Sequence, residues 1–312
     1  MNNVFLVTRP IQYINVLNLP IKIYKDILLL TPNFNGWENI LEIATNTPMW
    51  KNVVCIDSHK EIYRWIIHNR KSIKNFYTYS DNGISWHLLF SCLRKISFYV
   101  YEEGWASYST YSLSLFKKIL YFLINLDSNS GKYLGSSHFV KGIYVYDVKL
   151  HNALFPYNKR PLCEFKYSLN QVVLNISAIS QFLYNSNGIF YNKNVLIYIT
   201  SWNYNPKIDK ILSENKNYVT ILKPHPYFQR TQEIDNKFDY VIDGKYIAEL
   251  IIADLLNQTK YLLIVHECST VMLHFNDVGN NVCEINLKSQ LSNTKEYFKI
   301  RTAIKQINSL IS

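Results

Sequence analysis

The sequence has few of the residues that mark a secreted, metal-binding or membrane-spanning protein. It contains nine glycines, nine prolines and five cysteines in 312 residues. The cysteines are an odd, scattered set without a CxxC pair, which excludes a paired zinc or redox motif, so we expect them to be reduced and mostly buried. They are Cys55, Cys92, Cys163, Cys268 and Cys283.

Long apolar runs and a targeting leader are also missing. No uninterrupted apolar run reaches the roughly 18 residues that a spanning helix needs. The opening segment lacks a basic leader and is broken by Arg9 and Pro10. We therefore expect no cleaved signal and a cytoplasmic chain, with room for peripheral contact at the inner face of the plasma membrane.

The composition describes a well-cored globular protein with an excess of positive charge. Apolar residues make up 48% of the chain, and its length suits two domains. The formal net charge of +10 implies an acidic partner. Nucleic acid, an anionic membrane and an anionic sugar would all satisfy that requirement, so charge alone does not choose among them.

Two series of short, β-rich apolar stretches alternate with segments of helical spacing, such as residues 61–73. Strand, helix and strand repeated in this way predict an α/β fold with doubly wound parallel sheets. The less regular stretch at 155–165 and a helix near 171–184 separate the series, and we place the domain boundary at 158/159. The predicted strands are 3–8, 26–31, 52–57 and 96–101 in domain 1–158, and 194–200, 218–224, 240–244, 261–267 and 281–287 in domain 159–312.

The stretch YEEG places Glu102 and Glu103 between a predicted strand and Gly104. Two adjacent carboxylates repel each other, and repulsion raises the pKa of one of them, which makes the pair a candidate proton acceptor. A solvated loop is the alternative interpretation.

The stretch KPHP, residues 223–226, comes directly after the apolar run YVTIL of the predicted strand 218–224. Pro224 and Pro226 hold the backbone around His225 extended. The side chains of Lys223 and His225, two residues apart, should therefore point to the same side. A lysine and a histidine presented together can hold a phosphate, and a protonated histidine can hand it a proton.

Two further groups follow strands or begin helices of the second series. Ser269 and Thr270 come after the strand 261–267, where hydroxyl and backbone N–H groups suit an anion, although helix capping is the alternative. Glu249 lies early in a predicted helix and could accept hydrogen bonds from two ribose hydroxyls, unless it is an ordinary surface residue.

These motifs occur in an order that resembles a known group. Glu102-Glu103-Gly104, His225-Pro226 and Ser269-Thr270 match the D/E-D/E-G, HP and S-S/T motifs of the bacterial sialyltransferases of GT-B fold. The opening TRPIQ resembles the T-P-x-Q of that group, with Arg9 intervening. Over residues 3–290 the chain is most similar to glycosyltransferase family 52 and the related bacterial polysialyltransferase-like proteins.

The resemblance implies a GT-B fold, in which two Rossmann-like domains face each other across a cleft. It also implies metal-independent, inverting transfer of sialic acid from CMP-sialic acid to a sugar hydroxyl of lipooligosaccharide, O-antigen or capsule, without a cofactor. The first domain would hold the acceptor and the second the CMP-sugar. Glu102, Glu103 and His225 would be catalytic, and Lys223, His225, Glu249, Ser269, Thr270 and Ser201 would bind the donor.

One departure concerns the base. In part of family 52 the base is an aspartate in the loop after the first strand of the second domain, where this chain has Asn203 and Asn205. Since asparagine cannot accept the proton, either the glutamate pair or Asp209 would do so. The chain also lacks an Asp-x-Asp metal motif, so the histidine and hydroxyls would replace a cation.

Other interpretations stay open. The donor could be another CMP-activated acidic sugar such as Kdo. From a different class, the chain could be a non-catalytic protein that binds glycan or nucleic acid, although no nucleic-acid-binding signature is present. The segment 111–126 suits either a core helix or one lying on an anionic membrane. A homodimer is compatible with the sequence.

Overall fold

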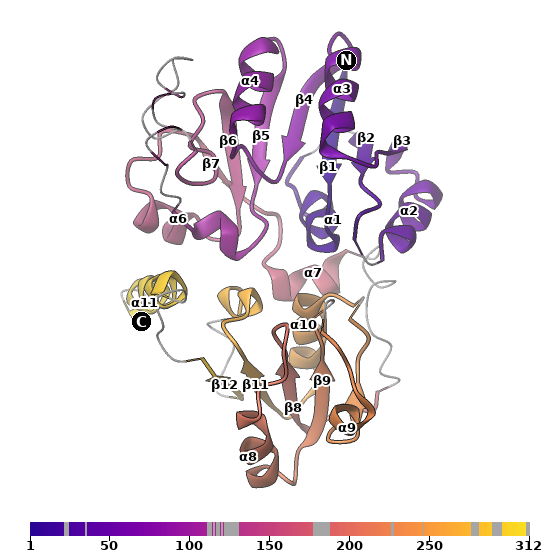
Figure 1. Cartoon of the computed structure of the whole chain (residues 1–312), viewed down its shortest axis with the longest axis vertical. Coiled ribbons are helices and arrows are strands. Elements are labelled where there is room, and N and C mark those ends of the chain that lie inside the picture. The colour runs from indigo at the N-terminus through magenta and orange to yellow at the C-terminus, as the bar shows by residue number, and fades with distance from the viewer. Residues whose placement is uncertain are drawn as a thin grey trace. The chain divides into compact units, whose positions relative to one another are not determined.

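The computed structural model forms two compact units, Met1–Lys166 with Ala303–Ser312 (unit 1) and Tyr167–Thr302 (unit 2). Figure 1 shows the elements of both. The predicted boundary at 158/159 lies in the last part of unit 1, and the final helix is divided between the units. The structure describes residues 1–21, 25–34, 36–110, 114, 116, 119, 121, 131–176, 188–225, 228–244, 246–275, 281–288 and 295–309.

Unit 1 is built on a sheet of seven parallel strands in the order β3-β2-β1-β4-β5-β6-β7. The central strands are buried on both faces, as their continuous apolar sequences predict. The strands are β1 Asn2–Val7, β2 Lys25–Leu30, β3 Trp50–Cys55, β4 Ile73–Thr78, β5 Ser97–Tyr101, β6 Val140–Val145 and β7 Leu162–Glu164.

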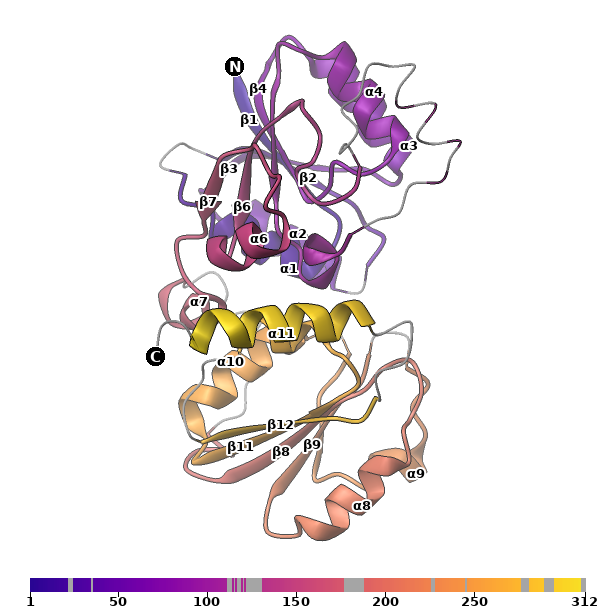
Figure 2. The ribbon, with the colours of Figure 1, turned by 90° about the vertical axis from the view of Figure 1, so that its left-hand side faces the viewer.

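The helices of unit 1 begin at residues suited to helix starts. Pro10 opens α1, and Ser58 caps α3 by accepting a hydrogen bond from the Glu61 N–H at 3.3 Å. Helices α3 and α4 lie side by side on one face of the sheet, as Figure 2 shows. The helical elements are α1 Pro10–Leu17, α2 Trp37–Asn46, α3 His59–Asn69, α4 Ile84–Cys92, the 3-10 turn η1 Trp105–Tyr108 and α6 Val148–Leu154.

Unit 2 contains a five-stranded parallel sheet in the order β10-β9-β8-β11-β12. Figure 2 shows α10 on one face of this sheet and α8 with α9 on the other. The strands are β8 Asn194–Ile199, β9 Val219–Lys223, β10 Tyr240–Val241, β11 Tyr261–His266 and β12 Val282–Asn286. The helical elements are α7 Leu169–Asn175, α8 Lys207–Glu214, α9 Gln232–Asp235, α10 Ala248–Gln258, η3 Thr270–Leu273 and α11 Lys295–Ser309, which continues into unit 1.

The predicted α/β fold with two parallel sheets is confirmed, with some local corrections. The helix predicted over 61–73 ends at Asn69, because the chain turns at 70–72 and enters β4. The irregular stretch 155–165 contains the edge strand β7, and β6 was not predicted. Residues 177–184 of the helix predicted near 171–184, and most of 111–126, lie outside the described residues.

The expectation that the cysteines are mostly buried is wrong. All five are free, and none is buried. Three of them, Cys55, Cys163 and Cys283, lie on β3, β7 and β12, which are edge strands with fewer neighbours. Across the part of the chain that the structure describes, no helix combines the length and the apolar character needed to cross a bilayer.

The order of strands reverses once in each sheet, and this reversal positions the candidate site. It lies between β1 and β4 in unit 1 and between β8 and β11 in unit 2. At such a point the loops from the carboxyl ends of the two strands run to opposite sides, and α/β proteins bind ligands there. The residues that follow these strands are therefore the ones to inspect.

Gly135 is expected to be essential for the stability of unit 1. Its φ is +78°, and a Cβ atom there would lie 2.1 Å from Cδ1 of the buried Ile143. We expect Gly135→Ala to lower the free energy of unfolding by about 3 kcal/mol, through left-handed strain and overpacking. Chemical denaturation followed by circular dichroism measures this effect.

Gly188→Ala is the matched control, since Gly188 has a φ of +74° and nothing within 4 Å of the added atom. Only the strain of about 1 kcal/mol should remain there. Equal losses in both variants would contradict the packing argument.

Candidate functional site

The acidic pair forms a turn directly after β5, close to the reversal in unit 1. Gly104 has a φ of +129°, which residues with a Cβ rarely adopt, so glycine allows this turn. The Ser107 N–H donates to the Gly104 carbonyl at 2.9 Å, and the Ser107 hydroxyl accepts from the Glu103 N–H at 2.8 Å. We call Glu102–Gly104 the acidic turn.

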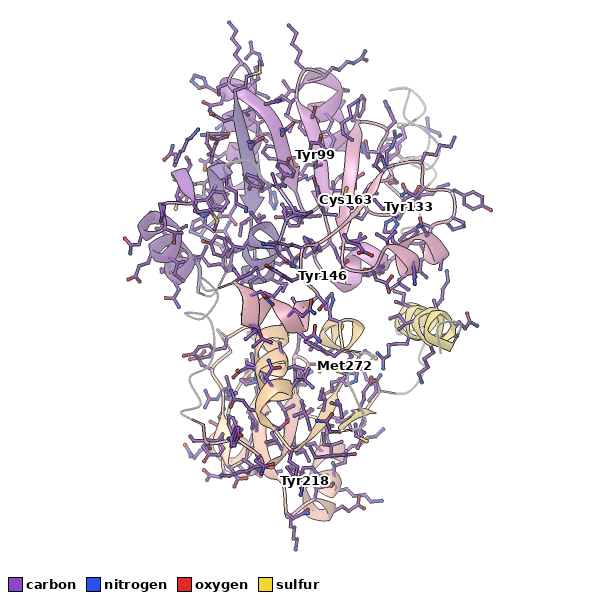
Figure 3. The ribbon with its side chains drawn as sticks, turned by 180° about the vertical axis from the view of Figure 1, so that it is seen from behind. Tyr99, Tyr133, Tyr146, Cys163, Tyr218 and Met272 are labelled. Carbon is purple, nitrogen blue, oxygen red and sulfur yellow. The ribbon has the colours of Figure 1, made fainter. Side chains whose placement is uncertain are left out.

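Glu102 is fully buried beneath this turn. Its Oε2 accepts hydrogen bonds from the Tyr108 hydroxyl at 2.6 Å and from the Tyr146 N–H at 2.8 Å. Its backbone carbonyl accepts from Asn15 at 2.6 Å, and the Asn15 side chain accepts from the Tyr146 hydroxyl at 2.6 Å. Figure 3 labels Tyr146 beyond the carboxyl end of the sheet that contains Tyr99. Burial raises the pKa of Glu102 to about 8, so this carboxyl group holds a proton at neutral pH.

Glu103 lies in a different environment, beside a cation. Its carboxylate contacts the Arg9 guanidinium at 2.7 Å and interacts with the Gln12 side chain, whose oxygen accepts from the Thr8 N–H at 2.6 Å. Burial raises the pKa of Glu103, while Arg9 and Gln12 oppose that rise. The opening motif TRPIQ therefore meets the acidic turn in space, and Arg9, which interrupts the motif, is the counter-ion of Glu103.

The predicted cause of the pKa shifts is wrong. Removal from water dominates for both glutamates, and the nearby charge that adds to the rise at Glu102 is Asp147 rather than Glu103. The predicted repulsion requires neighbouring side chains to face each other. Along an extended segment successive side chains point to opposite sides, and this separates the two carboxyl groups.

In unit 2, Lys223 ends β9 with its side chain turned inward. It is only 3% exposed, and its ammonium group donates to the carbonyl oxygens of Pro224 at 2.9 Å and Gly244 at 3.4 Å. Burial lowers the pKa of Lys223 to about 8, which Glu249 opposes by its negative charge. Burial also raises the pKa of Glu249, in the first turn of α10, and Lys223 opposes that rise. The two predicted donor-binding residues thus interact with each other.

His225 is half-buried at the exit of β9. Its N–H donates to the Thr200 hydroxyl at 2.9 Å, and its ring stacks on that of Trp202, with centroids 5.9 Å apart. Burial, and secondarily the charge of Lys223, lower the pKa of His225. Thr200 and Trp202 follow β8, so the exit of the neighbouring strand contacts both the backbone and the ring of His225, while the adjoining Pro226 lies outside the described residues.

Ser201 also follows β8, but its hydroxyl has an internal partner. It donates to Glu267 Oε2 at 3.2 Å, and the Tyr198 hydroxyl donates to Glu267 Oε1 at 2.9 Å. Lys288 lies 3.8 Å from the same carboxylate. Glu267 therefore joins the exits of β8, β11 and β12.

Ser269 begins the 3-10 turn η3 at the exit of β11, where a longer helix had been expected. Its hydroxyl accepts from the Val271 N–H at 3.4 Å, and the preceding Cys268 has a φ of +56°. We call Ser269–Leu273 the hydroxyl turn. The side chain of Thr270 lies outside the described part of the chain.

A closed set of polar contacts holds the hydroxyl turn from behind. The Ser269 N–H donates to His266 Nδ1 at 3.0 Å, so the proton of the neutral ring lies on Nε2, which donates to Glu284 at 2.8 Å. Arg301 of α11 pairs with Glu284 and donates to the Met272 carbonyl at 2.7 Å. Figure 3 labels Met272 near the carboxyl end of the five-stranded sheet of unit 2. The sequence motifs do not indicate His266, Glu284 or Arg301, because these residues come from three distant elements.

The segment after β8 contains Asp209, the alternative candidate for the catalytic base. Asp209, in the first turn of α8, pairs with Lys237 at 3.1 Å and accepts from the Tyr204 hydroxyl. Asn205 is used locally, since its side chain accepts from the Lys207 N–H at 3.2 Å. Asp209 is therefore committed to contacts within unit 2.

The structure gathers the predicted residues into two groups, each at one edge of a sheet. Glu102 and Glu103 follow β5, the strand next to the reversal of unit 1, while Ser201, His225 and Ser269 follow the adjacent strands β8, β9 and β11 of unit 2. Neighbouring strands lie about 4.8 Å apart, so the second group spans about 10 Å. Within the described ranges, no three His, Cys, Asp or Glu side chains are grouped to hold a metal ion.

Comparisons with known proteins bear on the fold. No protein-family model matches the chain, and no curated protein matches its sequence. Among solved structures it is similar to an alpha/beta-galactoside alpha-2,3-sialyltransferase from Photobacterium phosphoreum, with a TM-score of 0.57 and 14% identity over 97% of this chain and 95% of that one. It is also similar to the UDP-GlcNAc 2-epimerase from Neisseria meningitidis, with a TM-score of 0.53 and 12% identity over 100% of this chain and 91% of that one. The chain therefore has an α/β fold of the GT-B type.

We expect the stability of the chain to fall as pH rises through the range in which Glu102 keeps its proton. Its pKa is about 8 when folded against a usual value of 4.5, so between these values only the unfolded chain releases the proton. Glu102→Gln keeps an oxygen to accept from Tyr108 and Tyr146 but cannot ionise. Its stability advantage over the native chain should grow by about 1 kcal/mol per pH unit across this window.

Urea denaturation at several pH values measures that advantage, with Glu164→Gln as the control because Glu164 is exposed on β7. A constant difference between Glu102→Gln and the native chain from pH 5 to pH 8 would contradict the assignment.

Proposed function

We propose that the chain is an inverting sialyltransferase that moves sialic acid from CMP-sialic acid to a sugar hydroxyl of a bacterial surface glycan, such as lipooligosaccharide, O-antigen or capsule. It needs no metal and no cofactor. The acceptor is lipid-linked, and the protein works as a peripheral enzyme at the inner membrane face.

One observation carries this proposal: each parallel sheet has a different half of the required chemistry at the carboxyl ends of strands at or next to its reversal point. Unit 1 has two carboxyl groups there, and unit 2 has an imidazole and hydroxyl groups. The fold similarity to a sialyltransferase and to an epimerase solved with UDP-GlcNAc supports a sugar-nucleotide substrate.

The transfer is a single displacement. The acceptor oxygen forms a bond to the anomeric carbon as the bond from that carbon to the phosphate oxygen breaks, and its electron pair leaves with CMP. The acceptor proton passes to a carboxylate of the acidic turn. Glu102, with a pKa of about 8, is a strong base once ionised, whereas Glu103 is ionised more readily beside Arg9.

The departing CMP gains negative charge that unit 2 would stabilise. His225 has a lowered pKa, so it serves as a neutral hydrogen-bond donor until the donor phosphate raises that pKa. Ser269 and Thr270 add a hydroxyl-rich turn after β11, which His266 and Arg301 hold in place. Lys223 is buried, so it contributes through its field rather than by contact.

Two residues would hold the nucleoside. Glu249 accepts hydrogen bonds from the ribose hydroxyls, and its charge is balanced by Lys223. The Ser201 hydroxyl already donates its hydrogen bond to Glu267. Its oxygen can therefore accept a hydrogen bond from an N–H or O–H group of the nucleoside, but it has no further hydrogen to donate to the phosphate.

A donor screen with EDTA present tests donor identity and metal independence together. We expect CMP release from CMP-sialic acid in the presence of a galactoside acceptor, and no turnover of CMP-Kdo or UDP-GlcNAc. Release from CMP-Kdo alone would identify the other acidic sugar, and epimerisation of UDP-GlcNAc or a strict metal requirement would overturn the proposal.

Variants test the assigned roles. We expect His225→Ala to abolish transfer, and loss of the base, by Glu102→Gln or Glu103→Gln, to lower kcat by about 100-fold or more. If Glu102 is the base, the native rate rises with pH up to about 8, whereas a plateau at lower pH points to Glu103.

The control is Glu164→Gln, which should keep full activity because its side chain is exposed at the edge of the sheet. Full activity in both acidic-turn variants, or its loss in Asp209→Asn alone, would exclude the pair as the base.

A further inference from the structure

The positive charge of the chain is concentrated in unit 1. That unit has 20 Lys and Arg against 11 Asp and Glu, whereas unit 2 has 13 against 12. Within unit 1, residues 62–101 contain six basic residues, and all six are exposed. The same range contains one acidic residue, Asp81, which is fully buried. The six are Arg64, Arg70, Lys71, Lys74, Arg94 and Lys95.

Five of these cations come together at the amino-terminal edge of β4 and β5. Arg70 and Lys71 follow α3, Lys74 is the second residue of β4, and Arg94 with Lys95 precedes β5. Strands β4 and β5 are paired, with Asn75 opposite Ser97, so both clusters lie at the same edge. We call Arg70, Lys71, Lys74, Arg94 and Lys95 the basic edge.

Exposed aliphatic side chains accompany the basic edge. Ile67 on α3 is 47% exposed and Leu88 on α4 is 44% exposed. The two helices lie side by side in Figure 2, joined by Tyr63 and Trp86, whose rings meet edge to face with centroids 5.1 Å apart.

The described part of the next segment also exposes apolar side chains. Phe116 is 73% exposed and Ile119 is 52% exposed. Tyr121 packs edge-on against His87 of α4, with centroids 5.0 Å apart, so this segment adjoins the same helix.

We propose that the basic edge, with Ile67 and Leu88, docks unit 1 on an anionic lipid bilayer. Clustered lysine and arginine side chains are attracted to acidic headgroups, and neighbouring apolar side chains enter the boundary between headgroups and acyl chains. A nucleic acid would share the attraction to cations, but aliphatic side chains cannot stack on its bases. The combination of charges and aliphatic groups therefore fits a membrane surface.

Docking at this edge constrains the acceptor, a step that rests on the proposed function. The basic edge and the acidic turn lie at opposite ends of β5, separated by about 20 Å at the usual rise per residue. An acceptor hydroxyl must therefore stand about that far above the headgroups. Lipid-linked glycans of several sugars reach this height, and a single sugar on its lipid does not.

The test is co-sedimentation of the full chain with phosphatidylcholine vesicles, with and without phosphatidylglycerol. We expect binding only to the anionic vesicles, weakening as salt is added. The combined variant Lys71→Gln, Lys74→Gln and Lys95→Gln should bind about 100-fold more weakly, since each lysine contributes a factor of about five. Arg70 and Arg94 stay unchanged because each donates to a carbonyl at the end of its helix.

The matched control removes the same charge from unit 2, as Lys193→Gln, Lys216→Gln and Lys260→Gln, three exposed lysines. Equal weakening in both triple variants, or equal binding to neutral vesicles, would overturn the proposal. Tighter binding to single-stranded RNA, lost in the first triple variant, would identify nucleic acid as the partner instead.

CMP release on a short soluble acceptor separates this proposal from the proposed function. We expect both triple variants to keep the native rate, because the basic edge is remote from the acidic turn. If no variant and no native chain releases CMP, the transferase proposal fails, while the vesicle result still decides the docking proposal. Loss of release in the first triple variant alone would contradict a separate docking role.

Discussion

The Glu102 carboxyl group, removed from water at the end of β5, is the interaction on which the candidate site of unit 1 depends. Its Oε2 bonds to Tyr108 in its own loop and to the Tyr146 N–H in the loop after β6. Asn15 of α1 binds both the Glu102 carbonyl and the Tyr146 hydroxyl. One uncharged acid thus joins three segments, and Glu103 is left to meet Arg9.

In unit 2, ionised groups provide the contacts that hold the candidate site together. Lys223 and Glu249 oppose each other's pKa shift on burial, Glu267 accepts two hydroxyl hydrogen bonds, and Arg301 neutralises Glu284. A buried polar group without a partner would cost stability, so these contacts are a condition for placing polar side chains at the sheet edge. His225 is held nearby through its backbone N–H, which donates to Thr200, and through its ring, which stacks on Trp202.

The amino-acid sequence was sufficient to predict most of the fold, because strands buried on both faces are continuous apolar runs. Strand β4 was missed because its sequence IKNFYT carries polar residues and follows α3 after a turn at 70–72 that contains no glycine or proline. The strand order depends on contacts between distant segments, which periodicity does not report. The same limit applies to the site: the motifs located Glu102 and His225, whereas their partners Tyr146 and Trp202 carry no local signal.

The contact of Arg301 with the hydroxyl turn has a consequence for biosynthesis. The Arg301 guanidinium group of α11 bridges Glu284 and the Met272 carbonyl, so a helix that follows the whole sheet in the chain supports the hydroxyl turn. The five-stranded sheet can assemble on the ribosome before that helix is translated. The loop at 266–273 gains this support only after α11 has emerged from the ribosome.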